Sequence, residues 1–219
     1  MKQGCTVYAL LNFISRESQR CCFHGVPAPL MQLQAQALGI PLVTHAMPDD
    51  MREYEEEFKR AVRGIKDIRG MVFGDIYLDE HKEWVERVCS GIGMSCIEPL
   101  WNEPTGALME EFIDLGFVAV IISCKADLFG PEWIGRTIDR AMLSELQDRG
   151  ICPCGENGEF HTLVVDGPLF KQAIELASSE TVLVDGFWKH WFLDIKEYRC
   201  KDKWEQVFPR EIATAKARG

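Results

Sequence analysis

Short apolar runs alternate with amphipathic stretches along the chain as far as about residue 147. Continuous apolar runs of this length predict buried strands, which we expect at 6–11, 41–45, 70–73, 95–97 and 117–122. The stretches between them carry apolar residues at helical spacing and predict helices at about 29–38, 50–65, 81–92, 104–115 and 133–146. Gly39 and Gly116 stand where a glycine commonly ends a helix. Repeated strand–helix units predict an α/β fold, with a parallel sheet flanked by helices.

The pattern changes after residue 147. Strand-like runs at 160–165 and 181–195 follow one another without long helices. We therefore divide the chain into an α/β core at 1–147 and a smaller C-terminal α+β portion at 148–219. Residues 205–219 have the pattern of a helix or of a frayed tail.

The ends of the predicted strands are the first places to look for a site, because ligands of parallel sheets bind at the carboxyl ends of the strands. That rule directs attention to Asn12, to Gly74 and Asp75, and to the pair Ser123–Cys124. Asp75 suits a ligand-facing carboxylate. It equally suits the N-cap of the following helix, a role for which Asp79 competes.

The segment Cys154–Thr162 combines two glycines with a dense group of polar side chains, immediately before a strand-like run. Glycine permits a sharp bend and the close approach of a ligand, and polar groups crowded on a loop suit binding or chemistry. A structural turn would need a glycine and an asparagine, but not the carboxylates and the imidazole as well. Glu156, Glu159 and His161 suit general acid or base chemistry, or oxygen ligation of Mg²⁺ by the two carboxylates.

Several other side chains are candidates for binding, and for three of them a structural role is the alternative. Asn157 and Thr162 of the same loop suit the fixing of an amide or a carboxylate of a substrate. His24 lies in the loop before the first helix, where a histidine either contacts an anion or is merely exposed to solvent. Trp101 suits base stacking or packing. Arg136 suits an anion clamp or an ion pair with a nearby carboxylate.

Charge and hydropathy narrow the classes of function. A net charge of -10 over 219 residues argues against a nucleic acid duplex as the main partner. The longest apolar run, 117–122, is far too short to cross a bilayer, so we expect no membrane partner. The N-terminal residues lack the apolar core of a signal peptide, which favours a cytoplasmic protein.

The chain has nine cysteines, an odd number. Without a secretion signal they indicate a reduced cytosolic setting, and we expect most of them to be small buried hydrophobes. Their spacings lack the paired motifs of a zinc or iron–sulfur site, so we predict no such metal. Cys154, beside the glycine-rich loop, is a candidate nucleophile for which no activating base is identifiable.

The segment Gly155–Thr162 resembles the signature of the diphthine–ammonia ligase family, also called N-type ATP pyrophosphatases. Further segments resemble landmarks of that family in the same order, and the resemblance extends from about residue 6 to residue 195. These segments are 34–42, 74–76, 99–101 and 112–117. The resemblance implies a Rossmann-like fold of the adenine-nucleotide α-hydrolase (HUP) type.

The resemblance also implies a reaction and a set of site residues. The family uses ATP with Mg²⁺ to adenylate a substrate carboxylate, releases pyrophosphate, and lets ammonia attack to give an amide. On that pattern the catalytic residues are Glu156, Glu159 and His161, the substrate-binding residues are Gly155, Asn157, Gly158 and Thr162, and the nucleotide-side residues are Leu11, Asn12, Gly74 and Asp75. The carboxylate belongs to a small molecule or to a modified protein. The loop differs from the Gly-Gly-Glu-Tyr-Glu form usual in the diphthamide enzymes, which leaves the acceptor open.

One departure from the family is severe. The family opens with a central strand and a phosphate-binding loop, Ser-Gly-Gly-Lys-Asp-Ser, at a helix N-terminus. This sequence contains no such loop, and its run at 6–11 resembles the second strand of the family. Either the sequence starts downstream of the true start or was cut, or it is a short relative that has lost ATP turnover. A short relative has to close the gap in its sheet or take a strand from another chain, as in a homo-oligomer. We therefore expect no ligase activity from this chain alone, with a non-catalytic nucleotide- or metabolite-binding module as the alternative.

Overall fold

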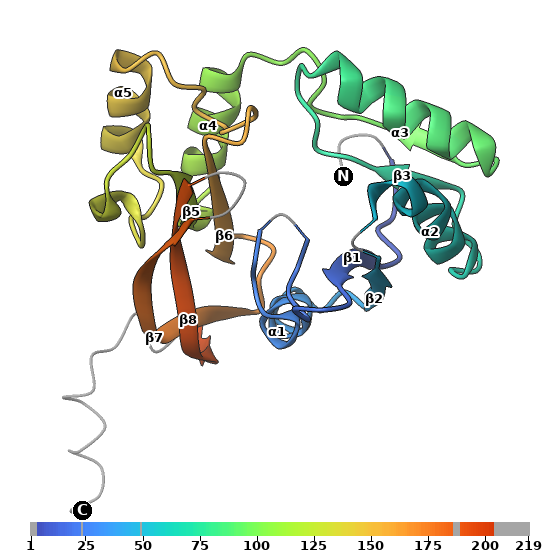
Figure 1. Cartoon of the computed structure of the whole chain (residues 1–219), viewed down its shortest axis with the longest axis horizontal. Coiled ribbons are helices and arrows are strands. Elements are labelled where there is room, and N and C mark those ends of the chain that lie inside the picture. Colours follow the sequence, from blue (N-terminus) through green and yellow to red (C-terminus); the bar gives the residue numbers. More distant parts are fainter. Residues whose placement is uncertain (1–3, 23, 49, 186–188, 204–219) are drawn as a thin grey trace, which may run out of the picture.

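The computed structural model describes residues 4–22, 24–48, 50–185 and 189–203. The segment 205–219, predicted as a helix or tail, lies outside these residues. Helices and strands alternate in the first half of the chain, and strands dominate the second half (Figure 1). The predicted mixed α/β class is confirmed. Across the described residues, no helix combines the length and the apolar character needed to cross a bilayer.

The first half of the chain forms two separate parallel sheets. Its elements are β1 (Leu10–Ser15), α1 (Ala28–Leu38), β2 (Leu42–Met47), α2 (Met51–Arg63), β3 (Gly70–Val72), α3 (Asp79–Gly91) and β4 (Ser95–Ile97). β1 pairs with β2 and β3 pairs with β4, both in parallel. The predicted parallel pairing is therefore confirmed, but the sheets are short and two-stranded rather than one continuous sheet.

The first strand begins later than its apolar pattern predicts. We expected it at 6–11, whereas β1 begins at Leu10. The Leu10 N–H donates to the Pro41 carbonyl at 2.8 Å, and β2 begins only at Leu42. Before that point the chain has no strand partner among the described residues, so residues 4–9 run along the cavity described below without forming a strand.

The second half of the chain forms one antiparallel sheet. Its elements are α4 (Thr105–Asp114), β5 (Val118–Lys125), the 3₁₀ turn η1 (Pro131–Trp133), α5 (Arg140–Asp148), β6 (Phe160–Asp166), β7 (Gln172–Asp185) and β8 (Lys189–Asp202). The strand order is β6-β5-β8-β7. The run predicted at 181–195 thus belongs to two long strands, β7 and β8, that pair with each other.

The pairing of β5 corrects a prediction. We expected its apolar run to join a parallel sheet, but β5 pairs antiparallel with β6 and β8. A continuously apolar strand is buried on both faces in either kind of sheet, so the run itself does not distinguish them. The two portions predicted on either side of residue 147 therefore share one sheet, and the boundary itself stays a prediction.

The helix predicted at 133–146 is also corrected. α5 begins at Arg140, because the Asp139 carboxylate caps it by accepting the Met142 N–H at 2.8 Å. Upstream, Trp133 ends the turn η1 and Thr137 bridges to Val120 of β5. The segment between η1 and α5 therefore runs alongside β5 instead of continuing the helix.

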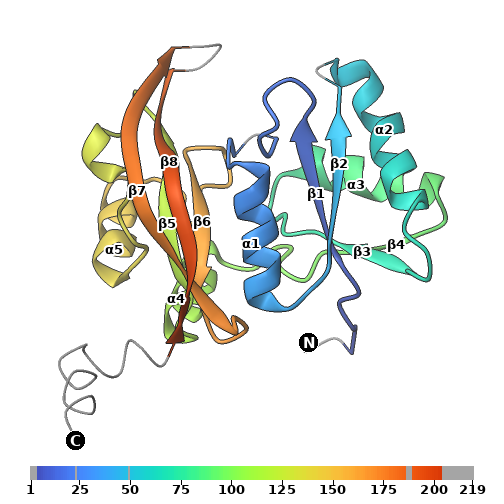
Figure 2. The same cartoon turned by 90° about the horizontal axis from the view of Figure 1, so that it is seen from below.

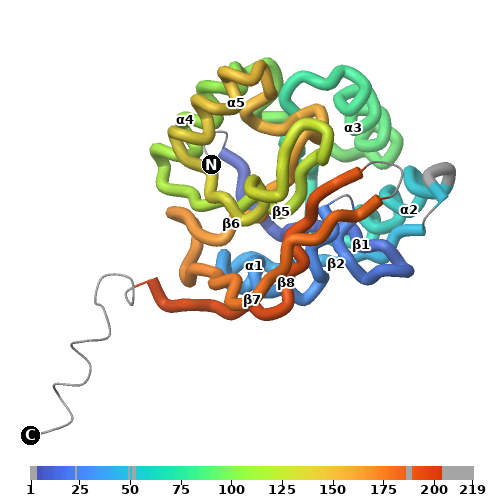
Figure 3. The backbone as a smooth tube through the Cα atoms, turned by 60° about the vertical axis from the view of Figure 1, so that its left-hand side comes forward, coloured from blue at the N-terminus to red at the C-terminus, as the bar shows by residue number. Residues whose placement is uncertain are grey.

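Helices cover both faces of the antiparallel sheet. α1 lies between this sheet and the β1–β2 pair, and its Leu30 and Ala37 pack against Leu163 and Val165 of β6 (Figure 2). On the opposite face α4 and α5 lie side by side (Figure 3). There Met142 belongs to a second apolar cluster under the sheet. α1 therefore holds the two halves of the chain together.

A third apolar cluster joins α2 and α3 to the parallel strands, with Met47, Phe58, Val62 and Val88 buried in it. β1 and β3 are not neighbours in any sheet. A cavity of about 2270 Å³ separates them, lined on one side by residues 4–11 and on the other by residues 67–73.

The cysteines are less buried than we expected. No disulfide is formed by any of the nine, all of which lie in the described residues. Only Cys89 and Cys124 are buried, and the other seven are half-buried. The apolar clusters are filled mainly by larger side chains, so most cysteines stand at the margins of the cores.

Candidate functional site

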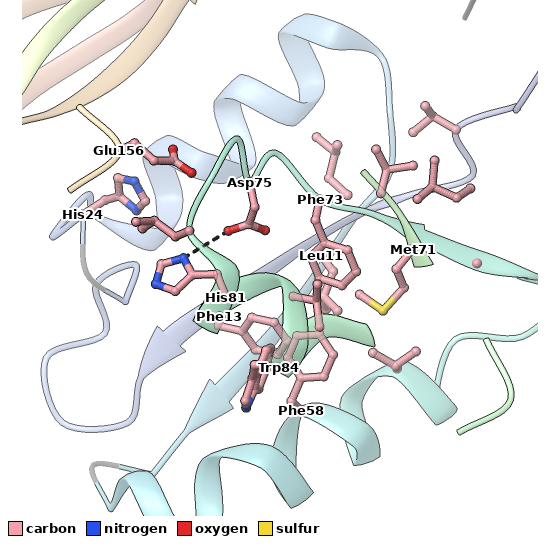
Figure 4. A pocket seen from close by; sticks show the side chains of 18 of the residues that line it. Leu11, Phe13, His24, Phe58, Met71, Phe73, Asp75, His81, Trp84 and Glu156 are labelled. Carbon is pink, nitrogen blue, oxygen red and sulfur yellow. Dashed lines mark hydrogen bonds and ion pairs between the residues drawn. The ribbon is translucent and has the colours of Figure 1, made fainter. Parts of the chain in front are cut away.

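The large cavity extends from the gap between the parallel sheets to the antiparallel sheet. Figure 4 shows that its two ends differ. The apolar end carries Leu11, Phe13, Phe58, Met71, Phe73 and Trp84. The polar end carries His24, Asp75, His81 and Glu156. The cavity therefore offers one ligand both an apolar surface and a group of charged and hydrogen-bonding side chains.

The glycine-rich loop before β6 is tightly folded at this cavity. The Gly155 N–H donates to the Cys152 carbonyl at 3.0 Å, and the Gly158 N–H donates to the Gly155 carbonyl at 2.9 Å. Both glycines have positive φ, +66° and +71°. A Cβ on Gly155 would lie 2.7 Å from the carbonyl oxygen of Phe160, so no side chain fits there. The two turns expose Glu156 and its neighbours to the cavity.

Two side chains of this loop reach the loop that follows β3. Glu156 Oε1 accepts the Ile76 N–H at 2.8 Å, across 80 residues of sequence. Asn157 Nδ2 donates to the Tyr77 hydroxyl at 2.8 Å. The predicted acceptor-side loop therefore contacts the two residues that directly follow Gly74 and Asp75, which were predicted to face the nucleotide.

Glu159 holds the loop together from within. It is 8% exposed and is not among the residues that line the cavity. Its Oε2 accepts the Asn157 N–H at 2.9 Å, and its Oε1 accepts from Asn157 Nδ2 at 3.0 Å. The structure thus places this predicted catalytic carboxylate as a brace for Asn157.

His161 lies at the start of β6 and lines the cavity. Its ring meets the ring of His24 edge-on, with the centroids 4.7 Å apart. Burial is the main cause that lowers the pKa of His161 to about 4, and His24, His190 and Lys125 add to the shift. The imidazole is therefore neutral at neutral pH and has one accepting nitrogen. The substrate-side residues Gly155, Asn157, Gly158 and Thr162 line the same cavity.

Asp75 faces the cavity and does not cap a helix. Its Oδ1 pairs with His81 Nδ1 at 3.1 Å (Figure 4). The N-cap position of α3 is Leu78, without a side-chain cap, and Asp79 is the first residue of the helix. Neither aspartate therefore has the capping role that the sequence left open.

The other nucleotide-side residues divide into two groups. Leu11 lines the cavity. Asn12 is buried behind it, and its Oδ1 accepts the Cys21 Sγ–H at 3.0 Å. Gly74 is exposed, and neither it nor Asn12 is among the cavity-lining residues. The structure brings Leu11 and Asp75 to the cavity and leaves Asn12 and Gly74 outside it.

The sequence left two roles open for Arg136 and for Trp101, and both side chains contact other residues. The Arg136 guanidinium pairs with Glu145 at 3.0 Å and lies 4.3 Å over the Trp133 ring. This supports the ion-pair reading, with a partner other than the nearest carboxylates in sequence. The Lys82 ammonium lies 4.7 Å over the Trp101 ring. Neither Arg136 nor Trp101 is among the residues that line the cavity.

Cys154 lines the cavity but is not activated. Its Sγ donates to the Thr105 carbonyl at 3.4 Å. Burial, followed by the neighbouring Cys152 and Glu156, raises the pKa of Cys154 to about 12. The thiol is therefore protonated at neutral pH, which does not support a nucleophilic role.

Sequence reasoning missed Tyr77, Lys125 and His190. Lys125 and His190 line the cavity and stand opposite each other on β5 and β8. The Lys125 ammonium donates to the Asn157 carbonyl at 2.9 Å. Opposite residues of an antiparallel pair share a face, but this signal requires the strand pairing, which the sequence did not reveal.

An adenine nucleotide fits the cavity in part. The apolar end suits a flat base, and Asp75 stands beside it. A triphosphate needs backbone N–H groups, usually from a glycine-rich loop at a helix N-terminus. In the part of the chain that the structure describes, α1 follows Pro27 and α3 follows Leu78, and neither helix is preceded by such a loop. The described residues therefore provide no phosphate cradle at this cavity.

Fold and site together define an α/β protein with a large cavity that is apolar at one end and polar at the other. Two family models match the chain: the diphthamide synthase N-terminal domain over residues 1–96 and the diphthamide synthase C-terminal domain over residues 104–201. The chain belongs to the diphthamide synthase family.

Curated relatives agree with the family match. A diphthine–ammonia ligase of Danio rerio is 28% identical over 228 residues, which cover 92% of this chain and 89% of the relative. The diphthine–ammonia ligase of Homo sapiens is 29% identical over 198 residues, covering 81% of this chain and 74% of the relative. That of Bos taurus is 31% identical over 169 residues, covering 74% and 63%. The similarity thus extends over most of the chain.

Proposed function

We propose that this chain forms the acceptor side of a cytoplasmic, ATP-dependent ligase that makes an amide from a carboxylate and ammonia. Its relatives are named diphthine–ammonia ligases. The observation that carries the proposal is the contact of Glu156 with Ile76 at 2.8 Å. That contact joins the acceptor-side loop to the residue after Asp75, which is expected beside the nucleotide, as a reaction between two bound substrates requires.

The proposed reaction has two steps. A carboxylate oxygen of the acceptor attacks the α-phosphorus of ATP, and pyrophosphate leaves. Ammonia then attacks the acyl carbon, the C–O bond to AMP breaks, and the surplus proton passes to a base. His161, neutral at neutral pH, is the candidate acceptor of that proton. Asn157, held by Glu159, and Thr162 are the candidates to orient the acceptor, which is a small molecule or a modified protein.

The nucleotide side is only partly built by the described residues. Leu11 and Asp75 line it, and Mg²⁺ would supply charge neutralisation of the triphosphate when bound. The proposed fold is of the adenine-nucleotide α-hydrolase type, in which a strand between β1 and β3 carries the phosphate-binding loop. A polypeptide segment other than the described residues would supply this strand, and a second copy of the chain in a homo-oligomer is one such source.

The first prediction concerns ATP turnover. The purified 219-residue chain should release no pyrophosphate from ATP above background, because the phosphate cradle is not among its described residues. The measurement is a coupled pyrophosphate assay with Mg²⁺ and ammonium, with an intact diphthine–ammonia ligase as positive control. Robust release by this chain would show that it builds a phosphate site by itself.

The alternative is a non-catalytic module that binds a nucleotide or a metabolite. It is supported by the same apolar end of the cavity, which suits a base whether or not phosphates react. Reading the DNA upstream of the Met1 codon discriminates between the two functions. An in-frame Ser-Gly-Gly-Lys-Asp-Ser motif favours the ligase, and a stop codon in that frame favours the module.

A further inference from the structure

Asn157 is held in the glycine-rich loop through all of its hydrogen-bonding groups except one. Its backbone N–H donates to Glu159 Oε2 at 2.9 Å, and its backbone carbonyl accepts from Lys125 Nζ at 2.9 Å. Its side-chain Nδ2 donates to Glu159 Oε1 at 3.0 Å and to the Tyr77 hydroxyl at 2.8 Å. Both protons of the side-chain amide are therefore used, and the amide oxygen Oδ1 is the group that remains.

The carboxylate of Glu159 fixes which way round this amide stands. A carboxylate only accepts hydrogen bonds, so the amide nitrogen and not the amide oxygen must lie against Glu159 Oε1. The reverse orientation of Asn157 would set two oxygens against each other, beside a residue that is 8% exposed, and this is costly. The places of Nδ2 and Oδ1 therefore follow from the chemistry of the partner.

The amide oxygen is the side-chain atom that Asn157 can offer to a ligand. Asn157 lines the cavity, whereas neither Glu159 nor Tyr77 is among the lining residues. These two partners hold the nitrogen side of the amide, and within the described residues Oδ1 itself accepts no hydrogen bond. An oriented acceptor at a cavity wall selects a ligand that carries a hydrogen-bond donor.

Charge at this wall is mixed. Glu156 lines the cavity with a carboxylate whose Oε1 accepts the Ile76 N–H, and Lys125 lines it with an ammonium group. A net attraction for cations or for anions does not follow from these two charges. The selection therefore depends on the donor that Asn157 Oδ1 can accept from, and not on the charge of the ligand.

We propose that Asn157 Oδ1 accepts a hydrogen bond from the nitrogen nucleophile of the reaction, which is ammonia, bound as ammonium. The inference rests on the proposed ligase function and gives its nucleophile a place in the cavity. Asn157 has no amide proton left for an ionised carboxylate, so orienting the acceptor falls to Thr162, which also lines the cavity. Glu159 is a positioning residue, because it acts on the nucleophile only through Asn157.

Ammonium binding can be tested on the intact 219-residue chain without ATP. The amide signals of Asn157, Gly158 and Ile76 are followed by NMR at neutral pH and constant ionic strength. Ammonium chloride replaces sodium chloride in one arm, and potassium chloride replaces it in the other. Potassium has nearly the size and the same charge as ammonium but no hydrogen-bond donor. Ammonium should therefore give saturable shifts and bind at least about tenfold more tightly than potassium.

Glu159→Gln should reverse the side-chain amide of Asn157. The Asn157 backbone N–H still needs an acceptor and takes the oxygen of the new amide. The nitrogen of the new amide then faces the Asn157 side chain, which turns its own oxygen to meet it. The amide would thus present donors to the cavity, and ammonium should lose its tighter binding relative to potassium.

Two further variants complete the test. Asn157→Ala removes Oδ1, keeps the backbone contacts with Glu159 and Lys125, and should also abolish the preference for ammonium. Glu145→Gln removes the same charge as Glu159→Gln outside the cavity, where Glu145 pairs with Arg136, and should keep the preference. The retained amide spectrum of each variant shows that it is folded.

Three results would overturn the ammonium site: no saturable shift with ammonium, equal affinities for ammonium and potassium, or an undiminished preference in Glu159→Gln and Asn157→Ala. Loss of the preference in Glu145→Gln as well would also count against it. The ligase proposal fails by a different result. It fails if ammonium binds at Asn157 while a chain that carries the phosphate-binding loop still releases no pyrophosphate from ATP.

Discussion

Gly155 and Gly158 stand in similar backbone conformations but in different surroundings. Both have positive φ. A Cβ on Gly155 would lie 2.7 Å from the Phe160 carbonyl oxygen, whereas a Cβ on Gly158 would have no neighbour within 4 Å. Gly158→Ala should therefore cost about 1 kcal/mol of unfolding free energy, the usual strain of a left-handed residue. Gly155→Ala should cost roughly 2–4 kcal/mol, because the backbone clash adds to that strain. Urea denaturation of both variants measures the difference, and equal losses would contradict the close approach.

His161 should make the stability of the protein depend on pH. Its pKa is about 4 in the folded chain and about 6.5 when unfolded, so the unfolded chain binds more protons between these values. Stability contributed by the neutral imidazole is therefore present above about pH 6.5 and is lost as the pH falls toward 4. Urea unfolding at several pH values should show a shallower loss in His161→Gln than in the wild type. His45→Gln, which removes a ring that pairs with Glu57 and does not line the cavity, serves as the comparison variant. Parallel pH profiles of wild type and His161→Gln would refute the assignment.

At the residue scale, the sequence indicated a loop that lines the cavity, but not how each of its side chains is held. Glu156 was predicted as catalytic and Asn157 as substrate-binding, and both side chains bond to the segment after β3. Glu159 was predicted as catalytic from the same pattern, but its carboxylate is buried and holds Asn157 in place. Lys125 and His190 were missed because their shared face depends on which strands pair, a non-local property.

At the element scale, helices with local end signals were predicted well. α1 ends before Gly39, whose φ of +69° and N–H bonds to preceding carbonyls make it a C-terminal glycine. α5 was misplaced, because the cap at Asp139 is a weaker signal than the apolar spacing upstream of it. β5 was found as a strand but given the wrong neighbours, since apolar content says nothing about the direction of a partner strand.

The edge of β3 that faces the cavity should be open. The Phe73 N–H donates to the Ile97 carbonyl of the neighbouring chain segment at 2.9 Å, so by alternation the N–H of Val72 points toward the gap. Val72 should therefore exchange its amide proton much faster than Phe73, its adjacent control. Hydrogen exchange followed by NMR measures both. Strong protection of Val72 in the purified chain would show that a strand already fills the gap.

At the scale of the whole molecule, the described residues form three sheets, and the cavity lies between the two parallel pairs and the antiparallel sheet. α1 packs against the antiparallel sheet on one side and lies beside the β1–β2 pair on the other, so it holds the halves in place without a continuous sheet. The halves meet at the polar end of the cavity through Glu156 and Asn157. The apolar end, between β1 and β3, is where a further parallel strand would gain partners on both sides.

Supplying that strand should stabilise the protein and complete its site. A strand–loop–helix segment with the Ser-Gly-Gly-Lys-Asp-Ser motif, taken from an intact relative, would be fused before Met1. The fusion should raise Tm by several degrees, since 1 kcal/mol corresponds to about 2–4 °C for a chain of this size, and it should protect the Val72 amide. Replacing the lysine of the motif by alanine should keep the gain in Tm but abolish pyrophosphate release from ATP, because the strand would still pair while the phosphate contact is lost. Calorimetry and the pyrophosphate assay measure the two effects separately. A fusion that raises neither Tm nor the protection of Val72 would show that the gap between β1 and β3 does not accept a strand.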